Sequence, residues 1–219
     1  MYELIQLTER TYYIKSPTNI GLFRLDEKNV CLIDSGNDKD AGRRIRQVLD
    51  ANGWQLTAIY NTHANADHIG GNRYLHGQTG CRIYAPGIDC AFTRHPVLEP
   101  SFLYGGYPPK DLRHKFLLAQ ESDAAELTAD KLPEGFASIP LPGHFFDMVG
   151  FRTPDVSGGL PFQPGDTGQV PDRLYLRRGR VPENAGAGAD HDREGICARA
   201  HGGDGGHRRP GAVQYPKGA

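Results

Sequence analysis

Thr62-His-Ala-Asn-Ala-Asp-His-Ile-Gly-Gly71 is the most informative segment of this chain. It holds two imidazoles, an amide and a carboxylate at close spacing: His63, Asn65, Asp67 and His68. Imidazole and carboxylate groups so close together, directly after an apolar run, are typical of a divalent metal site at the end of a strand. A polar loop that merely contains two histidines is the alternative. The sequence context on both sides of the stretch favours the metal site.

The stretch resembles the His-x-His-x-Asp-His signature of the metallo-β-lactamase superfamily. Three other runs support the resemblance: Val30-Cys-Leu-Ile-Asp34, Ala58-Ile-Tyr-Asn61 and Leu141-Pro-Gly-His144. They look like the family's early strand ending in a structural Asp, the strand that feeds the metal loop, and the later Pro-Gly-His motif. The resemblance spans roughly residues 18 to 155.

This resemblance implies an α+β fold, the four-layer αβ/βα sandwich of the family, with two metals held in a cleft at the sheet edges. The fold is expected to occupy residues 1–155 and to be incomplete at its C-terminal end. Residues 156–219 are expected to form a separate, poorly structured tail.

The resemblance also implies roles for individual residues. His63, Asn65 and His144 would bind the first metal, and Asp67 and His68 the second. Asp67 would also orient the attacking water and accept its proton, while Asp34 would accept hydrogen bonds that fix the loop. The metal is expected to be zinc, two per chain in the intact family and one or none here, with iron or manganese as alternatives. Such metals lower the pKa of a bound water to about 7 and polarise a carbonyl or phosphoryl oxygen.

The sequence departs from the family pattern in two ways. Asn65 replaces the second histidine, and an amide oxygen is a weaker donor to zinc than an imidazole nitrogen. The bridging Asp and the last His of the family have no counterpart at the matching positions. The tail does contain other candidate side chains, which are expected to be solvated: Asp166, His191, His201 and His207.

Short strands separated by turn residues are expected over Glu3–Leu7, Thr11–Ile14, Ile20–Leu25, Asn29–Ile33, Leu56–Tyr60, Cys81–Ala85, Ser138–Leu141 and Met148–Arg152. Apolar residues at helical spacing predict a helix over Asp38–Asn52, and helices are also expected over Asp67–His76 and Asp89–Thr93. The stretch Pro100–Pro109, which mixes aromatics with Gly and Pro, is expected to be a loop that either walls a substrate site or covers the core. The acids within Glu121–Glu126 are expected on a solvated helix face.

Composition excludes several classes of partner. The net charge is −1 and no basic block occurs, so nucleic acid is not expected as a partner. No signal-peptide pattern and no run of membrane-spanning length is present, so a cytoplasmic protein without membrane association is expected. The four cysteines lack paired spacing, which argues against a zinc knuckle or a disulfide framework. A small molecule is the expected substrate, and no pattern predicts an oligomeric state.

The chain changes character after Asp155. Only nine Val, Leu, Ile or Phe residues occur in the 64 residues from 156 to 219, and half of the 28 glycines lie there. This apolar fraction is below the ~20% under which a segment rarely buries enough surface to fold.

A shifted reading frame explains this change better than a natural disordered tail does. Codons built from the last two bases of one residue and the first of the next allow FLADCLSSRETLDKYRIGFI across residues 156–175. They allow FVPAHTEATEDIADLVQY from Ile196 onward. The two strings resemble the Gly/Ala-Asp and Pro-Ala-His motifs of the family. We therefore expect that a single-base insertion or deletion near Asp155 replaced the C-terminal third.

Three functions follow from these observations. The first is a metal-dependent hydrolase that uses metal-activated water on a small ester, thioester, amide or phosphoester. The second is a catalytically impaired remnant, because part of the metal site is missing. The third, ranked last, is an iron-dependent oxidoreductase. Asn65 does not resemble the carboxylate that the di-iron branch of the superfamily places there.

Overall fold

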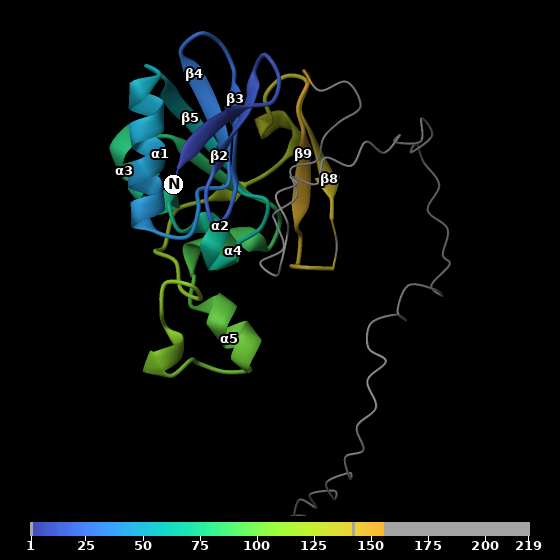
Figure 1. The fold of residues 1–219 in the computed structure, drawn as a ribbon. Coiled ribbons are helices and arrows are strands. Elements are labelled where there is room, and N and C mark those ends of the chain that lie inside the picture. Colours follow the sequence, from blue (N-terminus) through green and yellow to red (C-terminus); the bar gives the residue numbers. More distant parts are fainter. Residues whose placement is uncertain (1, 142, 156–219) are drawn as a thin grey trace, which may run out of the picture. The chain divides into compact units, whose positions relative to one another are not determined.

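The structure, a computed structural model, describes residues 2–141 and 143–155 (Figure 1). These residues all lie in the first of two compact units of the chain, Met1–Val181. The expectations for the tail, including its frame, therefore lie outside the described residues.

A seven-stranded mixed sheet forms the centre of the described fold. Its strands lie side by side in chain order: β1 (Glu3–Gln6), β2 (Thr11–Lys15), β3 (Ile20–Arg24), β4 (Asn29–Ile33), β5 (Gln55–Tyr60), β6 (Arg82–Ala85) and β7 (Ala125–Glu126). β1 to β4 pair antiparallel, whereas β4 to β7 pair parallel. Parallel neighbours end at the same edge of a sheet, so the segments that follow β4, β5 and β6 leave from one edge.

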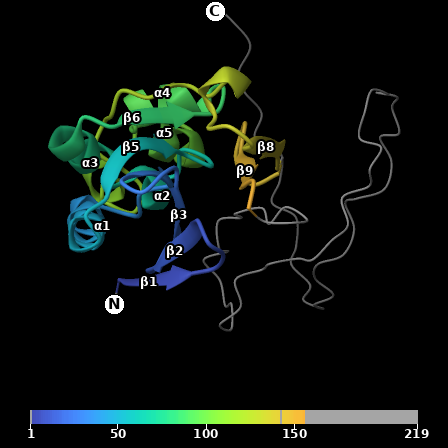
Figure 2. The same ribbon diagram turned by 90° about the horizontal axis from the view of Figure 1, so that it is seen from above.

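A second, two-stranded sheet is formed by β8 (Ala137–Pro140) and β9 (Val149–Arg152), which pair antiparallel with Ala137 opposite Arg152. It lies on one face of the large sheet. The helices α1 (Lys39–Ala51) and α3 (Asn72–Thr79) lie on the other (Figures 1 and 2). The described residues thus supply one helical layer and two sheets, which are three layers of the expected α+β sandwich.

Strand β4 shows why both faces of the sheet are covered. Its successive side chains point to opposite faces, and all four from Val30 to Ile33 are buried. Val30 and Leu32 pack in one core cluster with apolar residues of α1 and α3, and Cys31 and Ile33 pack in another with Phe151 of β9. Burying one large apolar side chain stabilises a fold by about 1.5–3 kcal/mol, so the two clusters hold the layers together.

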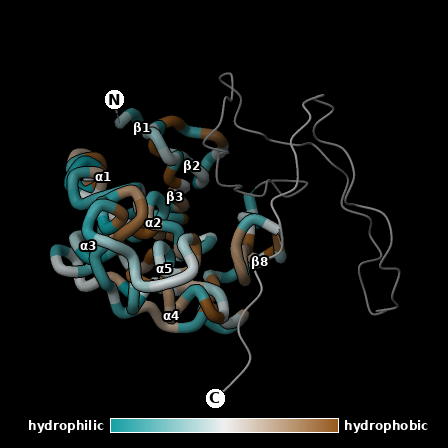
Figure 3. The backbone as a smooth tube through the Cα atoms, turned by 90° about the horizontal axis from the view of Figure 1, so that it is seen from below, coloured by the Kyte–Doolittle hydropathy of each residue, from teal (hydrophilic) through white to brown (hydrophobic). Residues whose placement is uncertain are grey.

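Helix α1 confirms the amphipathic pattern read from the sequence. The Asp38 carboxylate caps its first turn by accepting from the Ala41 N–H at 2.8 Å, and Asn52-Gly53 ends it. Ile45 and Leu49 are buried against the sheet. Figure 3 accordingly shows both teal and brown along this one helix.

The helix expected over Asp67–His76 is instead two helices, α2 (Ala66–Ile69) and α3, with Gly70 and Gly71 between them. A Cβ at Gly70 would overlap the backbone of Asn37, and one at Gly71 would overlap the Ser35 carbonyl oxygen. The glycines allow the chain to pass this close to the segment after β4, and the helix breaks there.

Two other expectations were wrong. Pro100–Pro109 begins inside a helix, α5 (Leu98–Tyr104), and only its second half is a loop. Pro100 is tolerated because it sits in the first turn, where its missing N–H is not needed, and Gly105 ends the helix in a left-handed conformation. The acids of Glu121–Glu126 lie on an extended segment that ends in β7, because that segment extends the sheet beside β6.

The remaining described elements are α4 (Asp89–Arg94) and two single 3-10 turns, η1 (Lys110–Leu112) and η2 (Ala129–Lys131). Cys31 and Cys81 are buried in the apolar core. Within residues 2–141 and 143–155, no helix is both long and apolar enough to cross a membrane.

Candidate metal centre

The predicted ligands gather at the edge of the large sheet where β4 and β5 end. β5 runs directly into the ligand loop, which we define as residues 62–68, and α2 occupies its second half. β9 reaches the same place, since the Val149 N–H donates to the Thr62 carbonyl at 2.9 Å. The segment before β9 carries His144, so both predicted ligand segments meet at this edge.

Asp34 anchors the ligand loop from the end of β4. Its backbone is in the left-handed region, with φ +64°, and its side chain is buried. One carboxylate oxygen accepts from the Thr62 N–H at 2.8 Å, and the other accepts from the Thr62 hydroxyl at 2.7 Å and from His68 Nδ1 at 2.8 Å. Burial alone would raise the pKa of Asp34, but His68 and the Thr62 N–H outweigh it, so this pKa is lowered. Asp34 is therefore an ionised acceptor.

These bonds settle which nitrogens of the two loop histidines carry a proton. The Thr62 hydroxyl has a single proton, which it gives to Asp34, so it must accept at its 2.9 Å contact with His63 Nδ1. His63 is then protonated on Nδ1, and its Nε2 presents a lone pair. His68 likewise gives its Nδ1 proton to Asp34, which points its Nε2 away from the anchor.

The two histidines differ in basicity. Burial, together with the nearby His68, lowers the pKa of His63 to about 3. Burial also acts to lower the pKa of His68, but Asp34 opposes it and the net direction is upward. His63 is therefore neutral at any physiological pH, the form in which an imidazole binds a metal.

Asn65 is oriented by Glu99, which reaches the ligand loop from α5. Glu99 is 4% exposed; it accepts from Asn65 Nδ2 at 2.7 Å and from the Ala66 N–H at 2.8 Å. Burial raises the pKa of Glu99 to about 7, against the effect of these two donors. The amide oxygen of Asn65 points away from Glu99 and is buried.

Asp67 and His144 complete the predicted set. Asp67 is partly exposed, with one carboxylate oxygen 3.6 Å from His68 Nε2 and 3.4 Å from the Thr18 hydroxyl. His144 is exposed, and its ring centroid lies 5.0 Å from that of His63, which is itself 4.2 Å from the His68 ring. The structure thus brings three imidazoles together beside one carboxylate.

Two further acids hold the ligand loop, and no pattern in the sequence marks either of them. Asp89, at the start of α4, is buried and accepts from the Ala64 N–H at 2.8 Å and from the Asp147 N–H at 3.2 Å. Glu99 is the other. Each is more than 20 residues from its partner in the loop, so no local spacing marks the contact. A buried acid satisfied by backbone N–H groups is recognised only once the fold is known.

Two acceptor atoms of the ligand loop are buried without a hydrogen-bond partner among the described residues: His63 Nε2 and Asn65 Oδ1. An unsatisfied buried polar atom costs about 1–3 kcal/mol, so a native fold retains one where something else satisfies it. Both atoms offer lone pairs, and both belong to the set predicted for the first metal. This arrangement fits a divalent cation.

The described side chains do not form a complete metal-ligand cluster of His, Cys, Asp or Glu. Within the described part of the chain, no three His, Cys, Asp or Glu side chains are close enough together to hold an ion. Asn65 would supply its donor as an amide oxygen, which lies outside that set. The tail candidates Asp166, His191, His201 and His207 lie outside the described residues.

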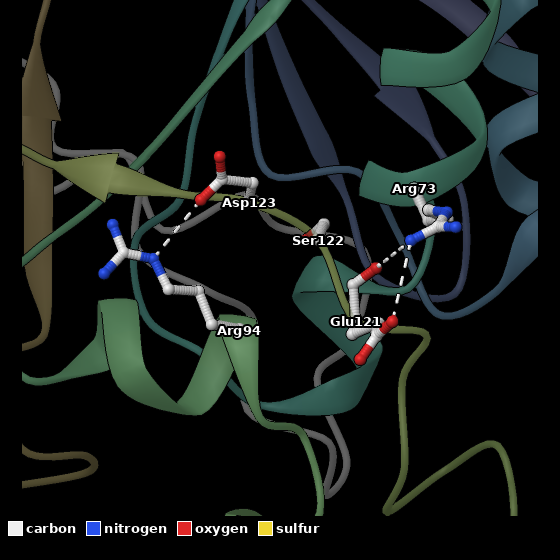
Figure 4. Close-up of a pocket in the computed structure, with 5 residues that line it drawn as sticks. All are labelled: Arg73, Arg94, Glu121, Ser122 and Asp123. Atoms are coloured by element: carbon white, nitrogen blue, oxygen red, sulfur yellow. Dashed lines mark hydrogen bonds and ion pairs between the residues drawn. The ribbon is translucent and has the colours of Figure 1, made fainter.

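A separate hollow of about 250 Å³ lies at the β7 side of the sheet and contains none of the predicted ligands (Figure 4). Two exposed ion pairs line it, Arg73 with Glu121 at 3.9 Å and Arg94 with Asp123 at 3.4 Å. Each positive charge there is matched by a carboxylate, so the hollow has no net attraction for an anion.

Residues 14–181 match a family model described as "Metallo-beta-lactamase superfamily". Among curated proteins, a hydroxyacylglutathione hydrolase of Methylococcus capsulatus is 42% identical over 55 residues, 22% of this chain and 22% of that protein. The protein of the same name from Bradyrhizobium sp. (strain ORS 278) is 49% identical over 47 residues, 22% of this chain and 18% of its own length. These matches span about a fifth of the relatives.

Solved structures show the same fold at lower identity. BJP-1, a subclass B3 metallo-beta-lactamase of Bradyrhizobium japonicum, superposes with a TM-score of 0.54 at 20% identity, over 69% of this chain and 56% of that one. A metallo-beta-lactamase of Cronobacter sakazakii superposes with a TM-score of 0.55 at 20% identity, over 69% of this chain and 58% of that one. The chain therefore covers under three fifths of these structures.

Proposed function

The chain belongs to the metallo-beta-lactamase superfamily, and from that premise we propose that it is a metal-dependent hydrolase of small molecules. The bond attacked is an ester, thioester, amide or phosphoester. One observation supports the proposal most: the ligand loop buries two acceptors, His63 Nε2 and Asn65 Oδ1, that have no hydrogen-bond partner within residues 2–141 and 143–155. A bound divalent metal would supply an acidified water and polarise the substrate oxygen.

In this proposal each predicted residue has a separate role as a metal ligand, an orienting group or a proton acceptor. His63, Asn65 and His144 hold the first metal, and Asp67 and His68 hold the second. Asp34 keeps His68 oriented with Nε2 outward through its 2.8 Å contact with Nδ1. Asp67, partly exposed beside His68 Nε2, orients the attacking water and takes its proton.

The substrate class is narrowed by the curated relatives, whose name describes hydrolysis of an acyl derivative of glutathione. An acyl thioester is accordingly the first substrate to test, ahead of oxygen esters, amides and phosphoesters. We propose zinc as the metal. Iron and manganese are the alternatives, because the Asn65 oxygen stands where the family has an imidazole nitrogen. A small-molecule substrate, a cytoplasmic location and no partnership with nucleic acid or membranes stay predictions of the sequence.

A second candidate is the impaired remnant, and it rests on the sequence of the tail. The bridging Asp and last His of the family have no counterpart at matching positions, whereas the shifted frame would supply both. We propose that the frame changed near Asp155 and that the chain as written holds one metal or none. Resequencing the coding DNA tests the frame directly: an intact single frame through residue 219, with no related product in the shifted one, overturns this part.

Metal content and hydrolysis, measured on the chain as written and on a frame-restored version, separate these possibilities. We expect two zinc equivalents and thioester hydrolysis from the restored protein, with less of both from the written chain. Equal activity of the two proteins would overturn the account of the tail. Iron with a redox-active spectrum would favour the oxidoreductase, and a restored protein without bound metal would overturn the hydrolase.

A further inference from the structure

Glu99 makes two contacts that together determine the orientation of the Asn65 amide. Its carboxylate accepts from Asn65 Nδ2 at 2.7 Å on one oxygen and from the Ala66 N–H at 2.8 Å on the other. An ionised carboxylate offers only acceptors, so the amide can turn only its NH₂ group toward Glu99. The Asn65 oxygen must then face the opposite way, where it lies buried without a partner among the described residues.

The direction of this oxygen matters because the two ends of an amide are chemically opposite. The oxygen carries lone pairs and can bind a cation, whereas the NH₂ group carries two protons and repels one. Burial and His68 lower the pKa of His63, and the Asn65 side chain lies close enough to that ring to oppose them. Like His63 Nε2, the amide oxygen is a buried acceptor of the ligand loop without a partner among the described residues.

We propose that Glu99 is a positioning residue that selects the cation-binding orientation of Asn65. The inference rests on the proposed metal site and deepens it. It assigns the oxygen of Asn65 as the donor at the position where the family has a histidine, and it names Glu99 as the residue that orients this oxygen. Glu99 touches neither metal nor substrate in this account. Its effect passes through one hydrogen bond to Asn65.

The variant Glu99→Gln tests the proposal with almost no change of shape. The Ala66 N–H is a backbone donor that cannot turn, so it keeps the Gln oxygen opposite it and leaves the Gln NH₂ facing Asn65. Two NH₂ groups cannot bond to each other, so the Asn65 amide must turn over to offer its oxygen. That turn places the Asn65 NH₂ beside His63 and removes the metal donor.

A reciprocal exchange of the two groups, Asn65→Asp combined with Glu99→Gln, should restore the site. The Gln oxygen still accepts from the Ala66 N–H, and the Gln NH₂ now donates to one oxygen of the introduced carboxylate. The other carboxylate oxygen faces His63, where it can bind a cation. Rescue by this exchange separates positioning from a general loss of structure.

Affinity for Mn²⁺, Co²⁺ and Zn²⁺ would be measured by calorimetry on the full chain at pH 8, above the pKa of about 7 of Glu99. Glu27→Gln is the matched control, because Glu27 is exposed in the turn before β4, at the opposite end of that strand from Asp34. We expect Glu99→Gln to lose at least about tenfold in affinity, the size of effect seen for groups that orient metal ligands. The exchange should recover it, and Glu27→Gln should match the parent chain.

Wild-type affinity in folded Glu99→Gln, or no recovery in the folded exchange, would overturn the proposal. A parent chain that binds none of the three ions would match the impaired remnant of the proposed function, and the orientation is then judged without metal. Nuclear magnetic resonance of the Asn65 side-chain NH₂ provides that measurement. Magnetisation transfer between the Asn65 NH₂ protons and the His63 ring that is stronger in Glu99→Gln than in the parent supports the inference, and equal transfer in the two proteins overturns it.

Discussion

The ligand loop and the segment 143–147 bring side chains to the same site, yet they are held in different ways. Three buried acids fix the ligand loop from three different elements: Asp34 after β4, Asp89 in α4 and Glu99 in α5. The segment 143–147 is attached through Asp147, whose N–H donates to Asp89 and whose carboxylate accepts from the Ile88 N–H, and through buried Phe145, whereas its histidine is exposed. Buried hydrogen bonds therefore hold the side chains of the ligand loop but not that of His144. We expect changes in the ligand loop to affect stability and changes at His144 to affect only binding.

The largest expected effect is the loss of the Asp34 anchor. Asp34→Ala leaves the Thr62 N–H, the Thr62 hydroxyl and His68 Nδ1 without their acceptor, all of them buried. Breaking such a buried charged network costs about 3–5 kcal/mol, and we expect the free energy of unfolding in urea to fall by that amount. Asp34→Asn is the control, since Asn tolerates φ +64° and keeps one oxygen, and it should lose less. An unchanged midpoint for Asp34→Ala would break the contrast between the two segments.

The close approach of the ligand loop to the segment after β4 gives the next effect. Gly70→Ala would force a Cβ against the Asn37 backbone, which cannot move aside as a side chain can, and we expect a loss of about 1–3 kcal/mol or more. Gly77→Ala is the matched control, because a Cβ at that position in α3 meets nothing within 4 Å. Alanine favours a helix over glycine, so this variant should gain about 0.5–1 kcal/mol. Thermal melts of both variants check the opposite signs.

A smaller effect is expected from the titration of Asp89. Burial raises its pKa from 3.8 to about 6, although the Asp147 and Ala64 N–H groups oppose the shift. Because the folded pKa is above the unfolded one, the protonated acid stabilises the fold. This contribution is complete below about pH 4 and is lost as the pH rises through about 6.

We therefore expect the parent chain to lose about 1–2 kcal/mol relative to Asp89→Asn between pH 4.5 and pH 7.5. Urea unfolding at the two pH values measures it, and the difference between the proteins cancels the titration of all other groups. A difference that stays constant with pH, or that changes in the opposite direction, would show that Asp89 is not held at a raised pKa. The Ala64 and Asp147 N–H groups would then outweigh burial at this carboxylate.

The contrast between the two segments also explains how far the sequence could predict the molecule. Strands such as Asn29–Ile33 and the helix α1 were found to within a residue or two, because their apolar periods and caps are local signals. The family resemblance similarly located the ligand loop, since the motif is contiguous. The break at Gly70 was missed, because two glycines inside a helical pattern reveal a close backbone contact only when the neighbouring segment is known.

The acids that clamp the ligand loop were missed for a related reason. Glu99 directly precedes Pro100–Pro109, the stretch expected to be a loop, and it meets Asn65 only because α5 packs against the ligand loop. Its burial at 4% exposure is set by tertiary packing, which no residue pattern around Pro100 encodes. Contacts of this kind are long-range and involve single side chains, so they carry no period that a sequence can display.

The smallest expected effect on stability comes from His144, and it is the sharpest test of the contrast. His144 is exposed and makes no side-chain hydrogen bond within the described residues, so His144→Ala should change the free energy of unfolding by no more than about 0.5 kcal/mol. If His144 binds metal, the same variant should still lose at least about tenfold in metal affinity, because even groups that only orient ligands contribute that much.

His63→Ala is the comparison variant. His63 is buried and bonded to Thr62, so its replacement should lower both stability and metal affinity. Calorimetric titration with Zn²⁺ alongside urea unfolding separates the two quantities. Full affinity in folded His144→Ala would remove this histidine from the site and leave the metal to the ligand loop alone.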